Sequence, residues 1–599
     1  MLKQEEILFI EKEIFSLLNY SYEGVITVVE YDGISIEGNK DAVSIGCKTK
    51  SDFARGLFLL AKGLSEGKQE LNIRQKPHFK DCGVMLSLSG PGILNVKSVK
   101  QFMLNMAALG MNAILLGMDD TYPLEDYPYF GHMRGRYSKE ELKEIDDYAD
   151  QIGIEAIPCI QTLAHLQRYL RWEEAAPVKD TAAVLLVGEE KTYDFIRCML
   201  QTLSGIFKSR RIHLGMDEAH SMGQGRYAKL HETVDPKQMF VEHLERVKEI
   251  CREENLSPII WSDMLFRLCG GEGGVNEEYD PKSVITEDIE KAVAGLNIMY
   301  WDYYRLEESE YDSIIKRHQA ITPETSFSGG IWTWDGYLPN FKYTFDTTYP
   351  AMKACLKNGI SEVYATLWDG QDTHFIHAVP GLAAFSEYCY LGEKCTEEDV
   401  LSASEFLTGI DREVLFASSE FFLGYEGAVK IGERFVDADL LFEILRYEVD
   451  YKEATRRYNK AIKILEKYPE NDFAQYAIKL IEIASIKSEL FSYLRPSYSK
   501  KDMNYIKKVA EEILPNLIKL YDDFFESYEK IALNQRKPFG IELIQIRFAG
   551  IKTRLLYAQR VLLEYVQGKR DKIEELDEPA LNKEHATWLG ADNFMKTRL

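Results

Sequence analysis

The sequence predicts an α/β protein: a (β/α)8 TIM barrel with a small N-terminal α/β domain and an all-α C-terminal domain. Three observations support this fold class. Short apolar runs alternate with helical patterns over residues 78–392, a mixed strand-like and helix-like segment occupies residues 1–77, and residues 396–599 have a helical pattern. Repeated βα units favour a parallel sheet, and eight of them suggest a closed barrel.

The first segment alternates strand and helix signals. "GVITVVEYDGISIEG" has a strand-like pattern, and the strand-like "DAVSIGCKT" runs into the helix-like "SDFARGLFLLAKGLSEG". We therefore predict a small α/β domain over residues 1–77.

The barrel prediction depends on the runs between residues 78 and 392. Helical patterns such as "SVKQFMLNMAALG" and "SKEELKEIDDYADQIG" lie between them. An open doubly wound sheet is the competing topology, but no G-x-G-x-x-G or Walker motif supports a nucleotide-binding version of it. The predicted strands are "GVMLSLS", "MNAILLGM", "IEAIPCIQT", "RIHLGMD", "PIIWSDM", "NIMYWDYY", "GGIWTWDG" and "VYATLWDG".

The last segment repeats apolar residues at helical spacing, as in "LLFEILRYEVDYKEATRRYNKAIKILEKY". We predict a helical domain over residues 396–599, with a structural rather than a catalytic role.

Composition limits the function classes. The net charge of −24 argues against nonspecific binding to nucleic acid or to anionic membranes. The nine cysteines are dispersed and form no C-x-x-C pattern, which suggests reduced thiols. The first residues carry acidic side chains within an apolar stretch, and no run of about 18 apolar residues suggests a membrane helix. We therefore expect a cytoplasmic protein.

Polar and aromatic side chains gather at the predicted strand ends, which converge on one pocket in a (β/α)8 barrel. Five of the seven tryptophans lie at four successive strand ends. Aromatic faces beside carboxylates suit a sugar. The strand-end residues are Asp119, Asp120, Gln161, Thr162, His165, His213, Asp217, Glu218, His220, Trp261, Asp263, Trp301, Asp302, Tyr304, Trp332, Trp334, Asp335, Trp368, Asp369 and Asp372.

The adjacent carboxylates Asp217 and Glu218 suggest glycoside hydrolysis. That reaction needs a proton donor for the leaving oxygen and stabilisation of an oxocarbenium-like centre. Adjacent residues on one strand tend to point in opposite directions, so this pair fits poorly as an acid and a nucleophile. It fits better if Glu218 protonates the glycosidic oxygen while Asp217 holds a 2-acetamido group that attacks C1, the substrate-assisted route.

"HLGMDEAH" resembles the H-x-G-x-D-E motif of glycoside hydrolase family 20, the β-N-acetylhexosaminidases. The similarity extends over residues 1 to about 392 and includes "IPCIQTLAHL", "YWDYY", "WSDM", "GGIWTWDG" and "TLWDG". The helical segment that follows suggests a branch of the family with an additional helical domain.

The resemblance implies an exo-acting enzyme that releases terminal β-linked GlcNAc or GalNAc through an oxazolinium intermediate, with no metal or organic cofactor. Glu218 would be the general acid/base, Asp217 would orient the acetamido nitrogen, and Tyr304 would hydrogen-bond the acetamido oxygen. Its partners would be glycans with a terminal N-acetylhexosamine. The residues expected to bind or support the substrate are Trp261, Trp301, Trp332, Trp334, Trp368, Asp302, His165, His213, Asp369 and Asp372.

The sequence departs from the family pattern at the first barrel strand. Family members often carry an arginine there, in an R-G-x-x-L-D pattern, whereas this sequence has "DCGVMLSLS", with Cys82 and Ser87 at the corresponding positions. Arg134 and Arg136, in "MRGRYS", are either substitutes for that arginine or solvated loop residues.

Two alternatives stay open. The missing arginine motivates a catalytically lapsed carbohydrate-binding protein of the same fold. A metal-assisted hydrolase that uses His213, Asp217 and His220 is the other.

Overall fold

The computed structural model describes residues 2–90, 92–231, 235–270, 278–334, 336–368, 375–424, 431–442 and 449–579. The chain forms two compact units. The first contains Met1–Ile331, Thr344–Asp369 and Ala378–Thr408, and the second contains Trp332–Tyr343, Gly370–His377 and Gly409–Leu599. The predicted three-domain division at residues 77 and 392–396 stays a prediction.

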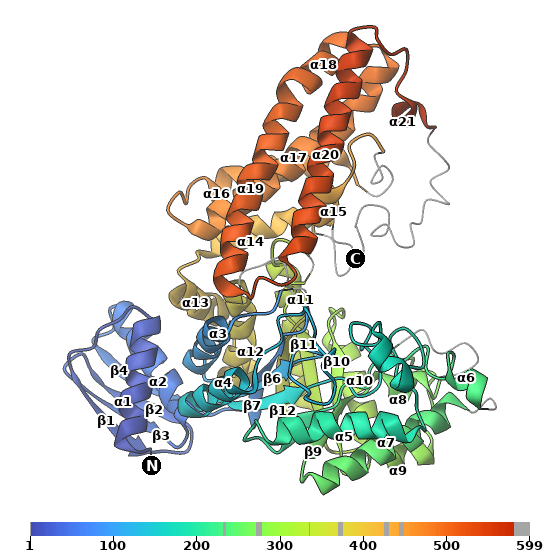
Figure 1. Ribbon diagram of the computed structural model, residues 1–599. Helices are drawn as coiled ribbons and strands as arrows, with labels where there is room; N and C mark the ends of the chain where they lie inside the picture. The colour runs from blue at the N-terminus through green and yellow to red at the C-terminus, as the bar shows by residue number, and fades with distance from the viewer. Residues whose placement is uncertain are drawn as a thin grey trace. The chain divides into compact units, whose positions relative to one another are not determined.

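The N-terminal region is a four-stranded sheet in the order β1-β3-β2-β4 (Figure 1). β1 runs parallel to β3, whereas β2 runs antiparallel to both of its neighbours. Helix α2 begins after Thr49, whose hydroxyl accepts the Asp52 N–H, and it packs on β2 and β3. The elements are α1 (Gln4–Leu17), β1 (Val25–Glu30), β2 (Ile34–Asn39), β3 (Ala42–Cys47), α2 (Lys50–Ser65) and β4 (Glu70–Gln75).

Eight parallel strands form a closed barrel, which confirms the predicted fold class. The barrel closes between β12 and β5, where Glu362 pairs in register with Asp81. The strands are β5 (Asp81–Ser87), β6 (Ala113–Gly117), β7 (Glu155–Cys159), β8 (Arg211–His213), β9 (Ser257–Trp261), β10 (Asn297–Asp302), β11 (Thr325–Gly330) and β12 (Glu362–Leu367).

Helices follow the strands and surround the barrel, as Figure 1 shows. Arg55 of α2 forms a buried ion pair with Glu387 of α12, which ties the N-terminal sheet to the barrel. The elements are α3 (Val96–Ala108), α4 (Lys139–Ile152), the 3-10 turn η1 (Glu173–Val178), α5 (Glu190–Ser204), α6 (Tyr227–Leu230), α7 (Pro236–Glu253), α8 (Asp263–Arg267), α9 (Glu287–Val293), α10 (Glu308–Ile321), α11 (Phe341–Lys357), the 3-10 turn η3 (Phe375–Ala378), α12 (Val379–Leu391), the 3-10 turn η4 (Gly392–Lys394) and α13 (Glu397–Thr408).

The seventh strand lies earlier in the chain than predicted. The predicted run was "GGIWTWDG", but β11 ends at Gly330, before both tryptophans of that run. The strand "TSFSGG" is not recognisable as an apolar run because it consists mainly of serine, threonine and glycine. Its serines can be buried because their hydroxyls form hydrogen bonds. Ser326 donates to Asn297 of β10, and Ser328 bonds Thr366 of β12.

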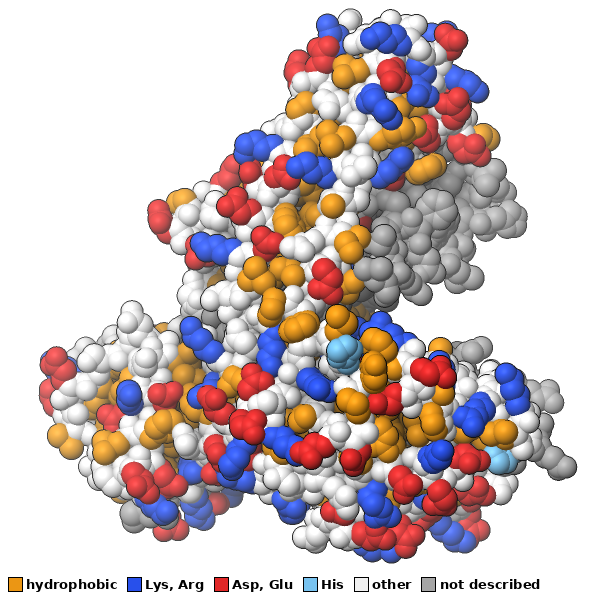
Figure 2. All heavy atoms as spheres, in the orientation of Figure 1, with side chains coloured by type: hydrophobic (Ala, Val, Ile, Leu, Met, Phe, Trp, Pro, Cys, Tyr) orange, Lys and Arg blue, Asp and Glu red, His pale blue; other side chains and the backbone are white. Residues whose placement is uncertain are grey.

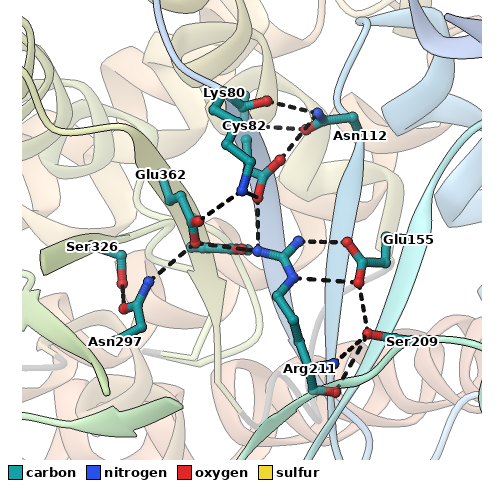
Figure 3. Close-up of polar contacts among 11 residues, drawn as sticks. Lys80, Cys82, Asn112, Glu155, Ser209, Arg211, Asn297, Ser326 and Glu362 are labelled. Atoms are coloured by element: carbon teal, nitrogen blue, oxygen red, sulfur yellow. Dashed lines mark hydrogen bonds and ion pairs between the residues drawn. The ribbon is translucent and has the colours of Figure 1, made fainter. Parts of the chain in front are cut away.

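A network of charged side chains closes the end of the barrel where the strands begin (Figure 3). Arg211, the first residue of β8, lies 2.7 Å from Asp81, 2.6 Å from Glu155 and 3.2 Å from Glu362. These three carboxylates are the first residues of β5, β7 and β12. The Asn297 side-chain amide donates to Glu362 at 3.3 Å, so the network reaches β10.

The second unit consists mainly of antiparallel helices, and a segment of the barrel sequence packs among them. Tyr337, which follows β11, makes ring contacts with Phe524 and Phe548, and Arg547 donates to its hydroxyl at 3.1 Å. The elements are α14 (Arg412–Ser419), the 3-10 turn η5 (Glu420–Phe422), α15 (Ile431–Asp437), α16 (Tyr451–Leu465), α17 (Asp472–Ser499), α18 (Met503–Lys508), the π-helical turn η7 (Val509–Ile513), α19 (Leu514–Gln535), α20 (Ile541–Val566) and α21 (Glu574–Asp577).

Figure 2 shows acidic and basic side chains interspersed over the visible face of both units. Among the described helices, none combines the length and the apolar composition that crossing a bilayer requires. All nine cysteines lie within the described ranges and carry free thiols.

Candidate active site

The segment after β8 has an unusual backbone. β8 ends at His213, and Gly215, Met216 and Glu218 then adopt positive φ angles of 72°, 71° and 48°. Non-glycine residues rarely occupy this region, and such strain concentrates at functional sites. Asp217 and Glu218 therefore lie on a loop, and the alternation of side chains along a strand, used above to separate their directions, does not apply to them.

His165, in the segment after β7, brings the two carboxylates together. Its Nε2 lies 3.2 Å from Asp217 Oδ2 and 3.6 Å from Glu218 Oε2. One ligand atom from each of the three residues lies within 4.8 Å of the other two. The supporting role of His165 stays a prediction, and the structure places its ring beside both carboxylates.

Charges in this group depend on one another. The negative charge of Asp217, its hydrogen bond and the nearby Glu218 raise the pKa of His165 to about 10, against the effect of burial. Burial would raise the pKa of Asp217, but the His165 charge and the hydrogen bonds from His165 and Gln161 lower it below its usual range. The pair is an imidazolium–carboxylate ion pair at neutral pH.

The metal hypothesis placed His213, Asp217 and His220 around an ion. Instead, His213 is fully buried, Gly215 N–H donates to its Nδ1, and burial lowers its pKa to about 3. His220 is exposed. Among the described residues, the group whose ligand atoms converge is His165, Asp217 and Glu218.

Asp217 is further fixed by the strand-end residue Gln161, whose amide donates to Asp217 Oδ1 at 3.3 Å. A side chain at Gly215 would place its Cβ 2.1 Å from Gln161 Oε1 and 2.7 Å from the Ile160 carbonyl oxygen. The glycine of the motif is therefore needed both for its positive φ and for this close approach.

Helix α8 supports Glu218. The Glu218 N–H donates to Asp263 at 3.1 Å, and the Trp301 indole donates to the same carboxylate at 3.3 Å. Arg267 contacts Asp263 at 3.1 Å and approaches Glu218 at 3.8 Å. Burial and the Asp217 charge raise the pKa of Asp263 to about 7.

The two tyrosines after β10 diverge. Tyr303 is buried and stacks on Trp301, with ring centroids 5.3 Å apart. Burial raises its pKa, and the charge of Asp217 adds to the effect. Tyr304 is 48% exposed and lines a cavity of about 570 Å³ with Glu278 and Arg305. The sequence analysis named Tyr304 and not Tyr303, although "YWDYY" contains both.

Asp302 is buried and its oxygens accept three hydrogen bonds, from the Tyr300 hydroxyl at 2.7 Å, the Tyr304 N–H at 3.1 Å and Arg305 at 2.7 Å. Burial raises its pKa in spite of the Arg305 charge. These contacts fix the turn after β10.

The predicted tryptophans fall into two groups. In the first unit, Trp261 is buried between His213, at 4.3 Å between ring centroids, and Trp368, at 5.9 Å. Trp332 and Trp334 belong to the second unit, where their rings lie 4.6 Å apart. Trp332 is buried, and Trp334 is partly exposed.

The candidate substitutes for the missing arginine bind the protein itself. Arg134 is buried, contacts Asp120 at 3.3 Å and donates to the carbonyls of Ser89 and Gly90. Arg136 donates to the Pro128 carbonyl at 3.2 Å. Cys82 is buried at the start of β5. Asp335, Asp369 and Asp372 lie outside the described residues.

The chain matches two sequence families along its length. "Glycosyl hydrolase family 20, catalytic domain" matches residues 83–314, and "Glycoside Hydrolase 20C C-terminal domain" matches residues 438–589. Hexosaminidase D from Bos taurus is 28% identical over 26% of this chain, and the human protein is 25% identical over 27%. These matches span 48% and 35% of the two relatives. A beta-hexosaminidase from Emericella nidulans is 24% identical over 60% of this chain and 69% of its own length.

Solved structures share the fold. A Flavobacterium johnsoniae chitobiase aligns with a TM-score of 0.51 at 14% identity, over 88% of this chain and 93% of that chain. A family 20 β-N-acetylhexosaminidase from Streptomyces coelicolor aligns with a TM-score of 0.50 at 18% identity, over 68% of this chain and 91% of that chain. The two family matches together span more than half of the sequence, one over the barrel and one over the helical region, and the chain belongs to glycoside hydrolase family 20.

Proposed function

We propose that the protein is an exo-acting β-N-acetylhexosaminidase that retains configuration through an oxazolinium intermediate. The observation that carries this proposal is the group of His165, Asp217 and Glu218, whose ligand atoms lie within 4.8 Å of one another at the ends of β7 and β8. The hexosaminidase names of the relatives support the substrate class.

In this mechanism the acetamido oxygen of the substrate attacks C1. Glu218, partly exposed to solvent, donates its proton to the leaving oxygen. Asp217 stays ionised because of His165, accepts the acetamido N–H and stabilises the positive charge that develops on the ring. Glu218 then removes a proton from the water that opens the oxazolinium ion, which restores the acid.

We assign the acetamido oxygen to Tyr303 rather than to Tyr304. Tyr303 is buried beside Trp301 and Trp368, and the Asp217 charge acts on its hydroxyl. Trp261 and Trp368 would form the apolar wall for the sugar. Sugar-binding roles for Trp332, Trp334, Asp369 and Asp372 stay predictions, as does cytoplasmic location, which the free thiols support.

A panel of p-nitrophenyl glycosides with N-acetylglucosamine-thiazoline as inhibitor tests the proposal. We expect hydrolysis of the β-GlcNAc or β-GalNAc glycoside, little hydrolysis of the β-glucoside, and potent inhibition by the thiazoline, which mimics the cyclised intermediate. Equal hydrolysis of the β-glucoside, or a glycosyl group bonded to the protein, would refute substrate assistance.

A lapsed carbohydrate-binding protein is the second candidate, because Arg134, a candidate for the missing arginine, is held by Asp120 and two main-chain carbonyls. Calorimetry with GlcNAc beside the activity assay separates the two. Binding without turnover would favour the lapsed protein.

A further inference from the structure

One guanidinium nitrogen links Glu218 to a second carboxylate at the edge of the site. Arg267 Nη2 lies 3.8 Å from Glu218 Oε1 and 2.9 Å from Glu278 Oε1. The Arg267 side chain is only 3% exposed, whereas that of Glu278 is 39% exposed. Arg267 therefore carries a buried charge between the expected proton donor and a solvent-facing partner.

The same short helix holds the Glu218 main chain. Asp263, four residues before Arg267 on α8, accepts the Glu218 N–H at 3.1 Å and contacts Arg267 Nε at 3.1 Å. Glu218 has a φ of 48°, a conformation that persists only where surrounding contacts enforce it. Asp263 and Arg267 thus hold the backbone and the carboxylate of the same residue.

A cation at this position poses a problem for acid catalysis. A nearby positive charge favours the ionised carboxylate, whereas a general acid must hold its proton until the leaving group takes it. Asp263 compensates Arg267 only partly near neutral pH, because burial raises the pKa of Asp263 to about 7. Glu278 adds a second carboxylate beside Arg267, with its Oε1 atom 2.9 Å from Arg267 Nη2.

We propose that Arg267 and Glu278 are positioning residues for Glu218: Arg267 holds its carboxylate in place, and Glu278 holds Arg267 and offsets its charge beside the expected proton donor. This inference rests on the proposed hydrolase function. Among the residues that the structure describes, the charged and titratable groups that face Glu218 or its arginine partner include His165, Asp217, His220, Asp263, Arg267 and Glu278.

The pH dependence of kcat/KM with p-nitrophenyl β-GlcNAc tests the role of Glu278. Glu278→Gln removes one negative charge beside Arg267, which should move the basic limb to lower pH by about half a pH unit, with the maximal rate kept within about twofold. Glu310→Gln is the matched control, because Glu310 also pairs with an arginine, Arg305 at 3.3 Å, and lines the cavity that Glu278 lines. Its profile should superimpose on that of the wild type.

The role of Arg267 is tested by Arg267→Lys, which keeps the charge but loses the fork that reaches several carboxylates. We expect kcat to fall about tenfold while KM changes less than about threefold, since Arg267 contacts Glu218 rather than the substrate. Thermal melts report whether this variant folds. If it does not fold, the surface variant Glu278→Gln still decides the question.

A basic limb in Glu278→Gln that matches the wild type, or an Arg267→Lys enzyme with wild-type kcat, would overturn this inference alone, provided that the wild type hydrolyses the substrate and is inhibited by the thiazoline. A wild type that hydrolyses none of the glycosides would overturn the proposed function and this inference together.

Discussion

The two ends of the barrel differ in how they treat charge. Where the strands begin, Arg211 is surrounded by Asp81, Glu155 and Glu362, and Asn297 contacts Glu362 in turn. Where they end, Asp217 and Glu218 lie close together on a strained loop, and one imidazolium lies between them.

The difference separates stability from chemistry. The charged residues at the first end lie on regular strands and pair with one another. Such an arrangement suits a structural role that requires no change during catalysis. At the second end, His165, Met216 and Glu218 all have positive φ angles, and each such residue costs about 1–3 kcal/mol. In (β/α)8 barrels generally, the face where the strands begin contributes to stability, and the face where they end carries the active site.

Glu218→Gln should give the largest effect and leave stability intact. We expect kcat for p-nitrophenyl β-GlcNAc to fall by about 10²–10⁴, because the variant cannot donate a proton. The loss should be larger with a disaccharide, whose leaving group needs protonation more. Asp217→Asn should also lower kcat strongly. Near-wild-type turnover in both variants would contradict the assignment.

Arg211→Met should produce the opposite phenotype. It leaves three carboxylates close together without their shared cation, so we expect the free energy of unfolding to fall by about 3–5 kcal/mol. Turnover per folded molecule should stay within about twofold. Urea unfolding and active-site titration measure the two quantities.

Lys80→Met is the control for that variant, because Lys80 approaches the same Glu362 at 3.4 Å from an exposed position. It should cost less than about 1 kcal/mol. A comparable loss in both variants would show that the network around Arg211 has no special role in stability.

Tyr303→Phe and Tyr304→Phe sharpen the comparison within the reactive end. Removal of a hydroxyl that bonds the acetamido oxygen should lower kcat/KM about 10- to 100-fold for Tyr303→Phe. Tyr304→Phe should change kcat/KM less than about threefold, since its side chain faces the solvent-open cavity. The reverse order of effects would restore the role first predicted for Tyr304.

The smallest expected effect concerns pH. The pKa of His165 is raised to about 10, so the stability from its pairing is complete below about pH 6.5 and is lost as the pH rises through about 10. The lowered pKa of Asp217 means that the same pairing is lost again in acid, below its usual value of about 3.8.

His165→Gln should remove this dependence. We expect the wild type to lose about 1–2 kcal/mol more than the variant between pH 6.5 and 10, a figure reduced for the partial exposure of His165. Urea unfolding of both proteins at the two pH values gives the difference. Parallel pH curves for the two proteins would show that the ion pair contributes no net stability.

The barrel was predictable because seven of its strands are apolar runs, whereas β11 was misplaced because its buried side chains are serines and glycines. The alternation of side chains holds only within a strand. Beyond the strand end it separated Asp217 and Glu218, whose carboxylates both lie close to His165. The ring around Arg211 also has a sequence signal, because an acidic residue is the first residue of each of β5, β7 and β12.

Tyr337 has a consequence for how the molecule can be divided. It follows β11 in the barrel part of the sequence, yet its ring packs between α19 and α20, where Phe524, Phe548 and Arg547 contact it. A chain shortened to end before α14 would strip this tyrosine of those neighbours, and the helices expressed by themselves would lack a piece of their interior. The helical region is therefore not a continuous segment of sequence that a single truncation could separate from the barrel.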